Sequence, residues 1–509
     1  MSSGRPPAEA RPGRPPRASY PKGRRPEVLF TLQRDELSAE EQVLAATLQG
    51  RLARSRGPAG IYLNVPGIGY GVWLDDLADR HGVDVREGDG VWPLVARFRS
   101  RFTGYVLYRN GPSVNVATTV AGVTGAVALE ESLEPLARRA GLRLVADVRD
   151  ADDAWAWREY GHRVRRDLAV EQKPEFSAQL RDYAVMAGAY TFFDGNSAFR
   201  REVVAGLDDD AAILGWGDAS NGEDGFVGPS SQAGVHTIPS DHAINVSTLS
   251  GFGIDRFEQR GSGRPPAADP DTHYVSFVLT DGDNIQWLLG DHQSSSRWFS
   301  SPHRGTFDMG WGISPSLIDL APTVLKWYYD NQSSGPHHDR FVVGPSGGGY
   351  LYPGRYPRGE LELHTERLNA AMARADLSVV QIIDFDTFPR TDLWSTYLKR
   401  PHIDGLIYLE YSRYDSHKGK VQWVHDKPVV SARTMLWEGL SGADEASVID
   451  ELNTATRNPG STEGYSVVMV HAWSKDLGNV RTVIDGLAPH VEVVPPDALI
   501  SMTARNVQR

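Results

Sequence analysis

The sequence predicts an α/β protein in which several small N-terminal α/β subdomains precede a C-terminal (β/α)8, TIM-like barrel. Short apolar runs alternate with helical segments from about residue 28 onward, and eight such runs follow residue 271. The chain has 509 residues, which is too long for one core, so several domains are expected. A doubly wound open sheet is the alternative, because counting strands does not exclude it.

The N-terminal half divides into three predicted α/β subdomains, which are 28–98, 99–173 and 174–262. In the first, Ser38-Ala39-Glu40-Glu41 is a capping box, so a helix is expected to run to about residue 56. The third piece is less regular and richer in Gly, Ser and Asp. The apolar runs predicted as strands are 61–63, 105–108, 126–129 and 142–148, and the further predicted helices are 73–81 and 152–166.

Residues 1–27 carry seven Pro and seven basic residues, a composition that predicts a disordered tail. Arg24-Arg25 is not followed by the apolar stretch of an export signal. We therefore expect a cytoplasmic protein, or a secreted one if the start of the chain is misassigned.

Composition excludes several classes of protein. The net charge of −12 disfavours a nucleic-acid partner, and no run of 18 apolar residues is present to span a membrane. The absence of cysteine excludes disulfides and thiolate metal sites. The signatures of P-loop NTPases, zincins and serine hydrolases are missing. The turn Gly67-Ile68-Gly69-Tyr70-Gly71 is an imperfect dinucleotide fingerprint, because Val72 stands where the third glycine should be.

A Gly- and Pro-rich stretch predicts a linker at 263–271, followed by the barrel-like catalytic domain at 272–509. The eight predicted strands are 274–279, 307–313, 341–343, 379–383, 405–409, 428–432, 466–470 and 491–494. The predicted helices between them are 317–329, 361–375, 393–398, 446–454 and 479–487.

Carboxylates and aromatic residues follow these strands, and in a (β/α)8 barrel the strand ends share one rim. Glycosidases use a pair of carboxyl groups and flat rings that cover sugar faces. We expect Glu410 and one of Asp281, Asp283 or Asp384 to form the catalytic pair. The predicted substrate-binding residues are Asn284, Trp311, Asp386, His471 and Trp473, together with Asp241 and His242 from a loop before the linker.

Each of these residues also has a purely structural interpretation. Asp281 and Asp283 could hold their turn through Asx hydrogen bonds, or bind a cation such as Ca²⁺. One of Asp384 and Asp386 could be a structural cap while the other points to the site, and His471 could be a core histidine. Trp311 and Trp473 could pack at the rim instead of binding sugar.

Gly347-Gly348-Gly349-Tyr350-Leu351-Tyr352-Pro353 is the most distinctive stretch of the chain. Three glycines disfavour a regular helix or strand and allow the backbone to approach a ligand closely, and two amphipathic rings follow them. These letters spell GxGYxYP, and the chain resembles the glycoside hydrolase family of that name over residues 28–505. The turn 280–284 and the segment 471–473 lie in the same order as in that family.

The resemblance implies small N-terminal subdomains, a barrel-like C-terminal domain, and sugar processing. It also implies that Gly347, Gly349, Tyr350 and Tyr352 belong to the site. We expect hydrolysis of an oligo- or polysaccharide, with a carbohydrate as the partner and with no obligatory cofactor or metal. Two alternatives stay open. One is a carbohydrate-binding protein without catalysis, and the other is a metal-assisted hydrolase or lyase that uses the turn with Asp281 and Asp283.

Overall fold

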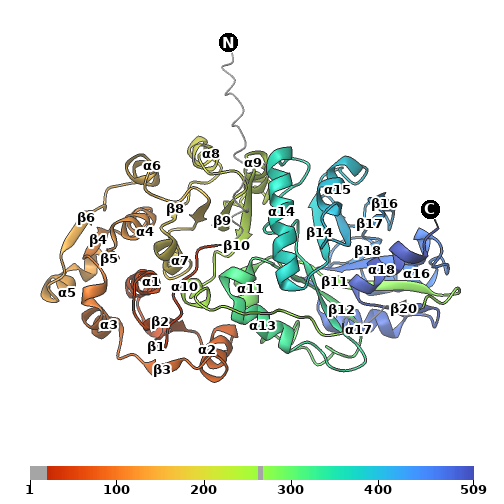
Figure 1. Cartoon of the computed structure of the whole chain (residues 1–509), viewed down its shortest axis with the longest axis horizontal. Coiled ribbons are helices and arrows are strands. Elements are labelled where there is room, and N and C mark those ends of the chain that lie inside the picture. The colour runs from red at the N-terminus through yellow and green to blue at the C-terminus, as the bar shows by residue number, and fades with distance from the viewer. Residues whose placement is uncertain (1–19, 262–266, 509) are drawn as a thin grey trace, which may run out of the picture.

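The structure is a computed structural model that describes residues 20–261 and 267–508. Figure 1 shows an elongated molecule, with the N-terminal subdomains at one end and the C-terminal domain at the other. Its described part contains four sheets, each covered by helices, so the predicted α/β class is confirmed. The short 3₁₀ helices are η1 (Arg34–Glu36), η2 (Arg99–Arg101), η3 (Glu131–Leu133) and η4 (Thr462–Gly464).

The first subdomain is a three-stranded parallel sheet in the order β2-β1-β3. The predicted capping box is present, because Ser38 and Glu41 each accept a hydrogen bond from the backbone of the other. Gly69 begins a helix and donates its N–H to the carbonyl of Gly290 at 2.7 Å, so the glycine turn packs on the C-terminal domain. The elements are β1 (Val28–Gln33), α1 (Ala39–Arg54), β2 (Ala59–Asn64), α2 (Gly69–Asp79), β3 (Asp84–Glu87) and α3 (Val91–Arg97).

The second subdomain is another three-stranded parallel sheet, in the order β5-β4-β6. Its three strands overlap the predicted ones, but the helix predicted at 152–166 is shorter because Gly161 caps it. The elements are β4 (Tyr105–Tyr108), α4 (Ser113–Thr124), β5 (Val127–Glu130), α5 (Glu134–Arg139), β6 (Leu144–Asp147) and α6 (Asp153–Tyr160).

The third subdomain is more regular than the sequence suggested, with four parallel strands in the order β10-β9-β7-β8. It begins before the predicted boundary at residue 174, because β7 at residues 168–171 belongs to its sheet. Its strands are three to five residues long and buried throughout, so they lack the alternation that marks a half-exposed strand. The elements are β7 (Leu168–Glu171), α7 (Arg181–Ala187), β8 (Tyr190–Phe192), α8 (Ala198–Ala205), β9 (Ala211–Gly215), α9 (Asp224–Gln232), β10 (Val235–Pro239) and α10 (Val246–Leu249).

Residues 20–27 differ from the predicted disordered tail, of which residues 1–19 lie outside the described part. Arg24 and Glu27 donate backbone hydrogen bonds to Ala53 and Pro58 at 2.8 and 2.7 Å. Lys22 forms an ion pair of 2.9 Å with Asp319 of the C-terminal domain. Composition alone could not reveal these partners, because they are far away in the sequence.

The C-terminal domain contains all eight predicted strands, each within two residues of the expected ends. They are β11 (His273–Leu279), β12 (Met309–Ile313), β13 (Asp339–Val343), β14 (Val379–Asp384), β15 (Gly405–Glu410), β17 (Lys427–Ser431), β19 (Tyr465–Val470) and β20 (Val491–Val493). Two short strands were not expected, β16 (Val421–Val424) and β18 (Thr434–Leu436). The helices are α11 (Ile285–Leu289), α12 (Leu317–Leu320), α13 (Pro322–Asp330), α14 (Arg358–Ala375), α15 (Thr391–Leu398), α16 (Glu445–Asn453), α17 (Leu477–Asp485) and α18 (Pro496–Asn506).

The strands of this domain follow one path, β16-β17-β15-β14-β13-β12-β11-β19-β18. The strands β17 and β18, near the two ends of this path, are separated in the chain by Ala432 and Arg433 alone, so one segment pairs first with β15 and then with β19. The predicted eighth strand does not lie between the seventh and the first. Among the described residues β20 pairs with the start of β11, and β19 pairs with β11 directly.

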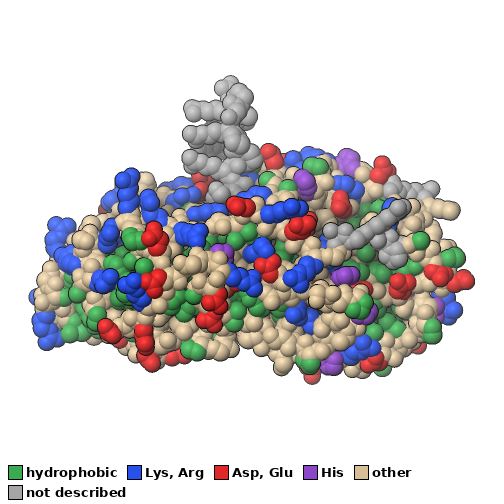
Figure 2. Space-filling view, turned by 60° about the horizontal axis from the view of Figure 1, so that its bottom comes forward, with side chains coloured by type: hydrophobic (Ala, Val, Ile, Leu, Met, Phe, Trp, Pro, Cys, Tyr) green, Lys and Arg blue, Asp and Glu red, His purple; other side chains and the backbone are tan. Residues whose placement is uncertain are grey.

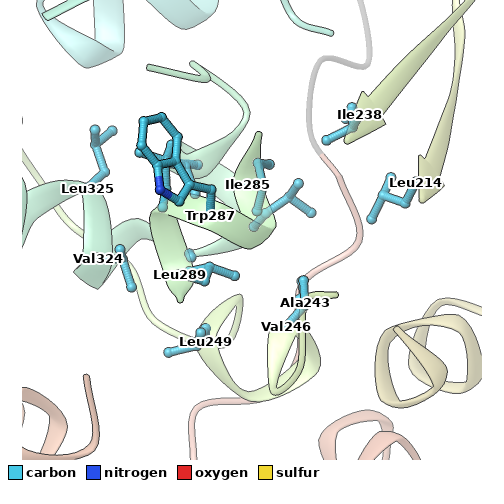
Figure 3. Packing of buried hydrophobic residues seen from close by; sticks show 14 of the residues in the cluster. Leu214, Ile238, Ala243, Val246, Leu249, Ile285, Trp287, Leu289, Val324 and Leu325 are labelled. Carbon is cyan, nitrogen blue, oxygen red and sulfur yellow. The ribbon is translucent and has the colours of Figure 1, made fainter. Parts of the chain in front are cut away.

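The third subdomain and the C-terminal domain share a hydrophobic core. Figure 3 shows Leu214 and Ile238, at the ends of β9 and β10, on one side of this core and Trp287 of α11 on the other. The other labelled residues of the same cluster are Ala243, Val246, Leu249, Ile285, Leu289, Val324 and Leu325. Because apolar contacts join the two parts, the loops that border this core are held in a fixed relation.

On the face shown in Figure 2, basic side chains gather toward the end with the N-terminal subdomains, while acidic and basic groups are mixed elsewhere. Among the described residues, no helix combines the length and the apolar character that crossing a membrane requires.

Candidate active site

A pocket of about 420 Å³ lies between the third subdomain and the C-terminal domain, and we call it the rim pocket. Loops that follow parallel strands build it from both sides. The loops after β9 and β10 contribute Trp216, Glu223, Asp241 and His242. The loops of the C-terminal domain contribute the predicted residues Asp281, Asp283, Asn284, Tyr350, His471 and Trp473. Ligand sites of parallel α/β folds lie at the carboxyl ends of strands, which is where this pocket lies.

Asp281 follows β11 with a left-handed backbone, φ +64°, in which its carboxylate accepts a hydrogen bond from the hydroxyl of Thr280. Thr280 is itself fixed, because its Oγ1 accepts the N–H of Ala472 at 3.1 Å. Burial raises the pKa of Asp281, while the hydrogen bonds from Thr280 and Trp473 and the nearby His471 oppose that rise. This side chain is therefore better prepared than its neighbours to carry a negative charge.

Asp283 and Glu223 bring two more carboxyl groups to the rim pocket. Burial raises the pKa of Asp283 well above its ordinary value, and the charges of Asp281 and Glu223 raise it further. Burial also raises the pKa of Glu223, with Asp281 adding to the rise. Glu223 accepts a hydrogen bond of 2.5 Å from the Tyr350 hydroxyl. Carboxyl groups with raised pKa values often serve as general acids or bases when they lie in one pocket.

Aromatic rings form part of the pocket wall. Trp216 and Tyr350 lie nearly parallel, with 6.2 Å between ring centroids and 6° between ring planes. Trp437 and His471 stack at 3.6 Å and 5°. Trp473 is 46% exposed, which is unusual for a side chain of this size. Flat rings of this kind cover the apolar C–H faces of sugars.

Gln381 of β14 lies in the pocket lining, fully buried, and neither its amide oxygen nor its amide nitrogen has a hydrogen-bond partner among the described residues. A buried amide left unpaired costs free energy. A ligand group that both donates and accepts, such as a hydroxyl, would satisfy it.

Three predicted acids lie outside the rim pocket, and two of them, Glu410 and Asp384, hold loops. Glu410 accepts hydrogen bonds from the Asp386 N–H at 3.0 and 3.2 Å and from the Tyr408 hydroxyl at 3.0 Å. Asp384 accepts from the N–H of Gly354 at 2.6 Å and from the Thr387 hydroxyl at 2.9 Å. Asp386 is exposed. Strand-end acids are expensive to bury unpaired, and Glu410 and Asp384 are satisfied by backbone N–H and hydroxyl groups near them.

Trp311 and Tyr352 also lie outside the pocket lining. Trp311 is 1% exposed, and its Nε1–H donates to Asp339 at 2.9 Å. Tyr352 is buried, with its ring 5.0 Å from that of Phe385 and 5.6 Å from that of Tyr350. Tyr352 therefore supports Tyr350 from behind.

The glycines of the 347–353 motif face histidines rather than the pocket. A Cβ on Gly347, which has φ +144°, would lie 2.5 Å from Nε2 of His364. A Cβ on Gly349 would lie 2.6 Å from Cδ2 of His236 and 2.8 Å from the carbonyl oxygen of Thr237. Tyr350 exchanges backbone hydrogen bonds of 2.7 and 3.0 Å with Thr237 of β10. The motif thus docks the C-terminal domain on the third subdomain and carries Tyr350 to the pocket.

These histidines belong to a buried group that we call the Asp210 cluster, made of Asp210, His236, His364 and Arg367. Asp210 Oδ1 lies 2.7 Å from Nδ1 of His364 and 3.2 Å from Nδ1 of His236, and Arg367 donates to Oδ2 at 2.9 Å. Burial alone would raise the pKa of Asp210, but the two histidines hold it well below its ordinary value. A cavity of about 210 Å³ adjoins the cluster.

Asp210, His236 and His364 have ligand atoms within 4.8 Å of one another, which is spacing suited to a metal ion. The hydrogen bonds favour a different assignment. The Gly348 N–H points at Nε2 of His364 at 3.3 Å, so the proton of that ring lies on Nδ1, where it is donated to Asp210. A protonated Nδ1 cannot bind a metal, so we assign the cluster to the support of the motif loop.

The acid that the sequence analysis missed is Glu223. It follows β9, and the rule that sites lie after parallel strands would have found it if it had also been applied to the third subdomain. Trp216, Gln381, Tyr414 and Trp437 were missed as well, and all four lie in the pocket lining. Gln381 carries no signal in the sequence, because a glutamine inside an apolar strand is not diagnostic.

Four family models together match almost the whole chain. They are described as "GxGYxYP_N 1st domain" over residues 28–100, "GxGYxYP_N second domain" over 102–164, "GxGYxYP third domain" over 166–251 and "GxGYxYP putative glycoside hydrolase C-terminal domain" over 271–504. No curated protein sequence matches the chain.

Among solved structures, the chain is similar to a "putative hydrolase" from Bacteroides thetaiotaomicron. The identity is 32%, the TM-score is 0.90, and the match covers 97% of each chain. A 4-alpha-glucanotransferase from Thermococcus litoralis matches with 10% identity and a TM-score of 0.30 over 45% of this chain and 40% of that one, a likeness too weak to support an argument. The matches along the whole chain, together with the intact motif at 347–353, show that this protein belongs to the GxGYxYP family.

Proposed function

We propose that the protein is a glycoside hydrolase whose active site is the rim pocket and whose substrate is an oligo- or polysaccharide. The observation that carries this proposal is the meeting of Asp281, Asp283 and Glu223 in one pocket walled by aromatic rings. Glycosidic bonds are cleaved by a protonated and an ionised carboxyl group acting together, and raised pKa values supply the protonated one. The family description and the hydrolase neighbour agree with this reaction class.

We assign the ionised role to Asp281 and the acid role to Glu223. Asp281 accepts the Thr280 hydroxyl and faces His471, and both favour its charged form. Glu223 comes from the other domain, so the two groups approach a bound sugar from separate elements. Asp283 lies two residues after Asp281, and its pKa is raised by burial and by the charges of Asp281 and Glu223, so the group of three acids keeps a proton.

We also propose that the C-terminal domain is a barrel-like frame closed by the segment 427–436. That segment pairs with β15 through β17 and with β19 through β18, which supports a ring of parallel strands. In such a frame the carboxyl ends of the strands converge on one rim, and Asp281 and His471 follow the ends of β11 and β19 there.

The first test is a screen for reducing ends released from a broad panel of oligosaccharides and polysaccharides. Once a substrate is found, we expect Asp281→Asn and Glu223→Gln each to lower kcat/KM about 10³-fold, because general acid–base steps contribute 10²- to 10⁴-fold. The melting temperature of both variants should stay at or above that of the wild type.

Glu410→Gln is the matched control, because it removes a carboxylate that holds a loop outside the pocket. We expect it to lower the melting temperature while keeping most of kcat. If Glu410→Gln abolishes turnover in a folded protein while Asp281→Asn leaves it intact, the assignment is wrong. Sugar binding without release from any substrate would favour the non-catalytic alternative, and activity lost in chelator and restored by a divalent ion would favour the metal-assisted one.

A further inference from the structure

The lining of the rim pocket gathers carboxyl groups without a permanent positive partner among the residues that the structure describes. Four carboxyl groups line it, those of Glu223, Asp241, Asp281 and Asp283, and no Lys or Arg lies among the lining residues that the structure describes. The two histidines in the lining are His242, which is 3.9 Å from Asp241, and His471. The largest charge effects on the pKa of Asp283 come from Asp281 and Glu223, so these groups repel one another.

Such a pocket is selective by charge. A uronic acid, a sialic acid or a sulfated sugar would place an anion beside these carboxylates and would be repelled. A neutral sugar would leave the repulsion unchanged. A sugar with a positive charge would relieve it, because an opposite charge in a site of low dielectric is worth more than the same charge in water.

A second observation points to a ligand that is a sugar and not a bare ion. Gln381 is fully buried in the lining, and its two amide atoms have no partner in the described parts of the chain, so they match a group that donates and accepts at once. The stacked pairs Trp216–Tyr350 and Trp437–His471 add flat surfaces, which an ion would not use.

The spacing of the acids also disfavours a metal ion as the positive charge. In the part of the chain that the structure describes, the group of three or more His, Asp or Glu residues with ligand atoms within 4.8 Å is the Asp210 cluster. The pocket acids do not form such a group, so their charge is spread over a larger volume than one ion fills.

We propose that the rim pocket takes a hexosamine unit whose amine is free and protonated, as in chains of glucosamine or galactosamine. The amine would lie among the carboxyl groups, a hydroxyl would pair with Gln381, and the ring would cover the aromatic wall. This inference rests on the glycoside hydrolase function proposed above and specifies its substrate class. An N-acetylated hexosamine lacks the charge and is the closest competitor.

The test compares oligomers of equal length at pH 6, where the hexosamine amine keeps its proton. The probes are oligomers of glucosamine, galactosamine, N-acetylglucosamine, glucose and glucuronic acid. Binding is measured by calorimetry and by the fluorescence of the pocket tryptophans, and cleavage by reducing-end release. We expect at least one of the two free-amine oligomers to bind about tenfold more tightly than the N-acetylated one, and glucuronic acid oligomers to bind least. Raising the salt concentration should weaken the free-amine binding most.

The variant that probes the charge is Asp241→Asn, whose side chain lies in the pocket lining but has no assigned step in the reaction. We expect it to reduce the preference for free amine over N-acetyl several-fold. Asp150→Asn makes the same change at a side chain that is 91% exposed in the second subdomain, and it should leave the preference unchanged.

The outcomes separate the two proposals. Cleavage of neutral oligomers with no preference for a free amine would overturn the substrate class and leave the hydrolase function standing. Tight, salt-sensitive binding of free-amine oligomers without any cleavage would support the substrate class and overturn the hydrolase function. Displacement of bound glucosamine oligomers by micromolar Ca²⁺ would show that the pocket carboxyl groups form a metal site, which would overturn the inference.

Discussion

The Asp210 cluster and the rim pocket both bury aspartates between the same two domains, and their electrostatics are opposite. Asp210 has two histidines and an arginine around its carboxylate, and its pKa is held low. Asp283 has two other carboxyl groups around it, and its pKa is raised. A buried acid that is fully paired indicates support of the fold. A buried acid left with like charges indicates a site that a ligand completes.

The largest effect expected from this contrast concerns the Asp210 cluster. Asp210→Ala leaves Arg367 and two histidines without their anion, and breaking a buried ion pair costs about 3–5 kcal/mol. We expect a large fall in the free energy of unfolding, measured by urea denaturation with tryptophan fluorescence. Asp283→Ala in the pocket should cost much less or even stabilise the protein. A larger loss at Asp283 than at Asp210 would reverse the assignment of the two regions.

The next effect concerns the motif glycines that rest on the cluster. Gly347→Ala places a Cβ 2.5 Å from His364 at φ +144°, so we expect it to destabilise by about 1–3 kcal/mol. Gly359→Ala in α14 is the matched control, because no atom of residues 20–261 or 267–508 would lie within 4 Å of its Cβ and alanine favours a helix. Equal melting temperatures for the two variants would contradict the close packing of the loop on His364.

A smaller effect is the dependence of stability on pH, which should have opposite sign in the two regions. The lowered pKa of Asp210 contributes stability that is present above about pH 4, the ordinary pKa, and is lost as pH falls through the folded-state value. The raised pKa of Asp283 contributes stability below that ordinary value, which is lost as pH rises through the folded-state value.

Asp283→Asn should therefore be more stable than the wild type near pH 7, by about 1 kcal/mol, and no more stable near pH 4. Asp210→Asn should be less stable than the wild type near pH 7, with a smaller deficit near pH 4. Denaturation curves at the two pH values measure both differences. Parallel pH profiles for the two variants would show that the acids do not differ as the structure indicates.

The fold was largely predictable because apolar runs and turn residues are local signals. Each of the eight strands after residue 271 was expected within two residues of its ends, and the capping box at Ser38 was found as predicted. The pairing partner of β20 was not predictable, because a strand of three residues can pair with any strand that has a free edge beside it. The four-stranded third sheet was missed because its buried strands show no alternation.

The candidate site was also predictable only in part, because local sequence signals mark strand ends but do not determine loop conformation. Asp281 and Asp283 were predicted because their turn follows a strand directly, and both lie in the pocket lining. Glu410 and Asp384 are the last residues of their strands, but their carboxylates accept hydrogen bonds from backbone N–H groups in the loop that follows the preceding strand. The loop conformation decides whether such an acid lines the pocket or is bound by a loop, and the position of a residue at a strand end does not predict that conformation. Glu223 was not predicted, because acids that follow strands were considered as catalytic residues only in the C-terminal domain.

The β-bridge between Thr237 and Tyr350 limits how the chain can be divided into separate domains. An excised C-terminal domain, residues 271–504, would keep Asp281 and Asp283 but lose Glu223, Asp241 and the strand that holds Tyr350. It would also expose the apolar surface around Trp287. The smallest unit that can contain the whole pocket therefore joins the third subdomain to the C-terminal domain, so recombination of the C-terminal domain onto foreign partners would need to carry the third subdomain along.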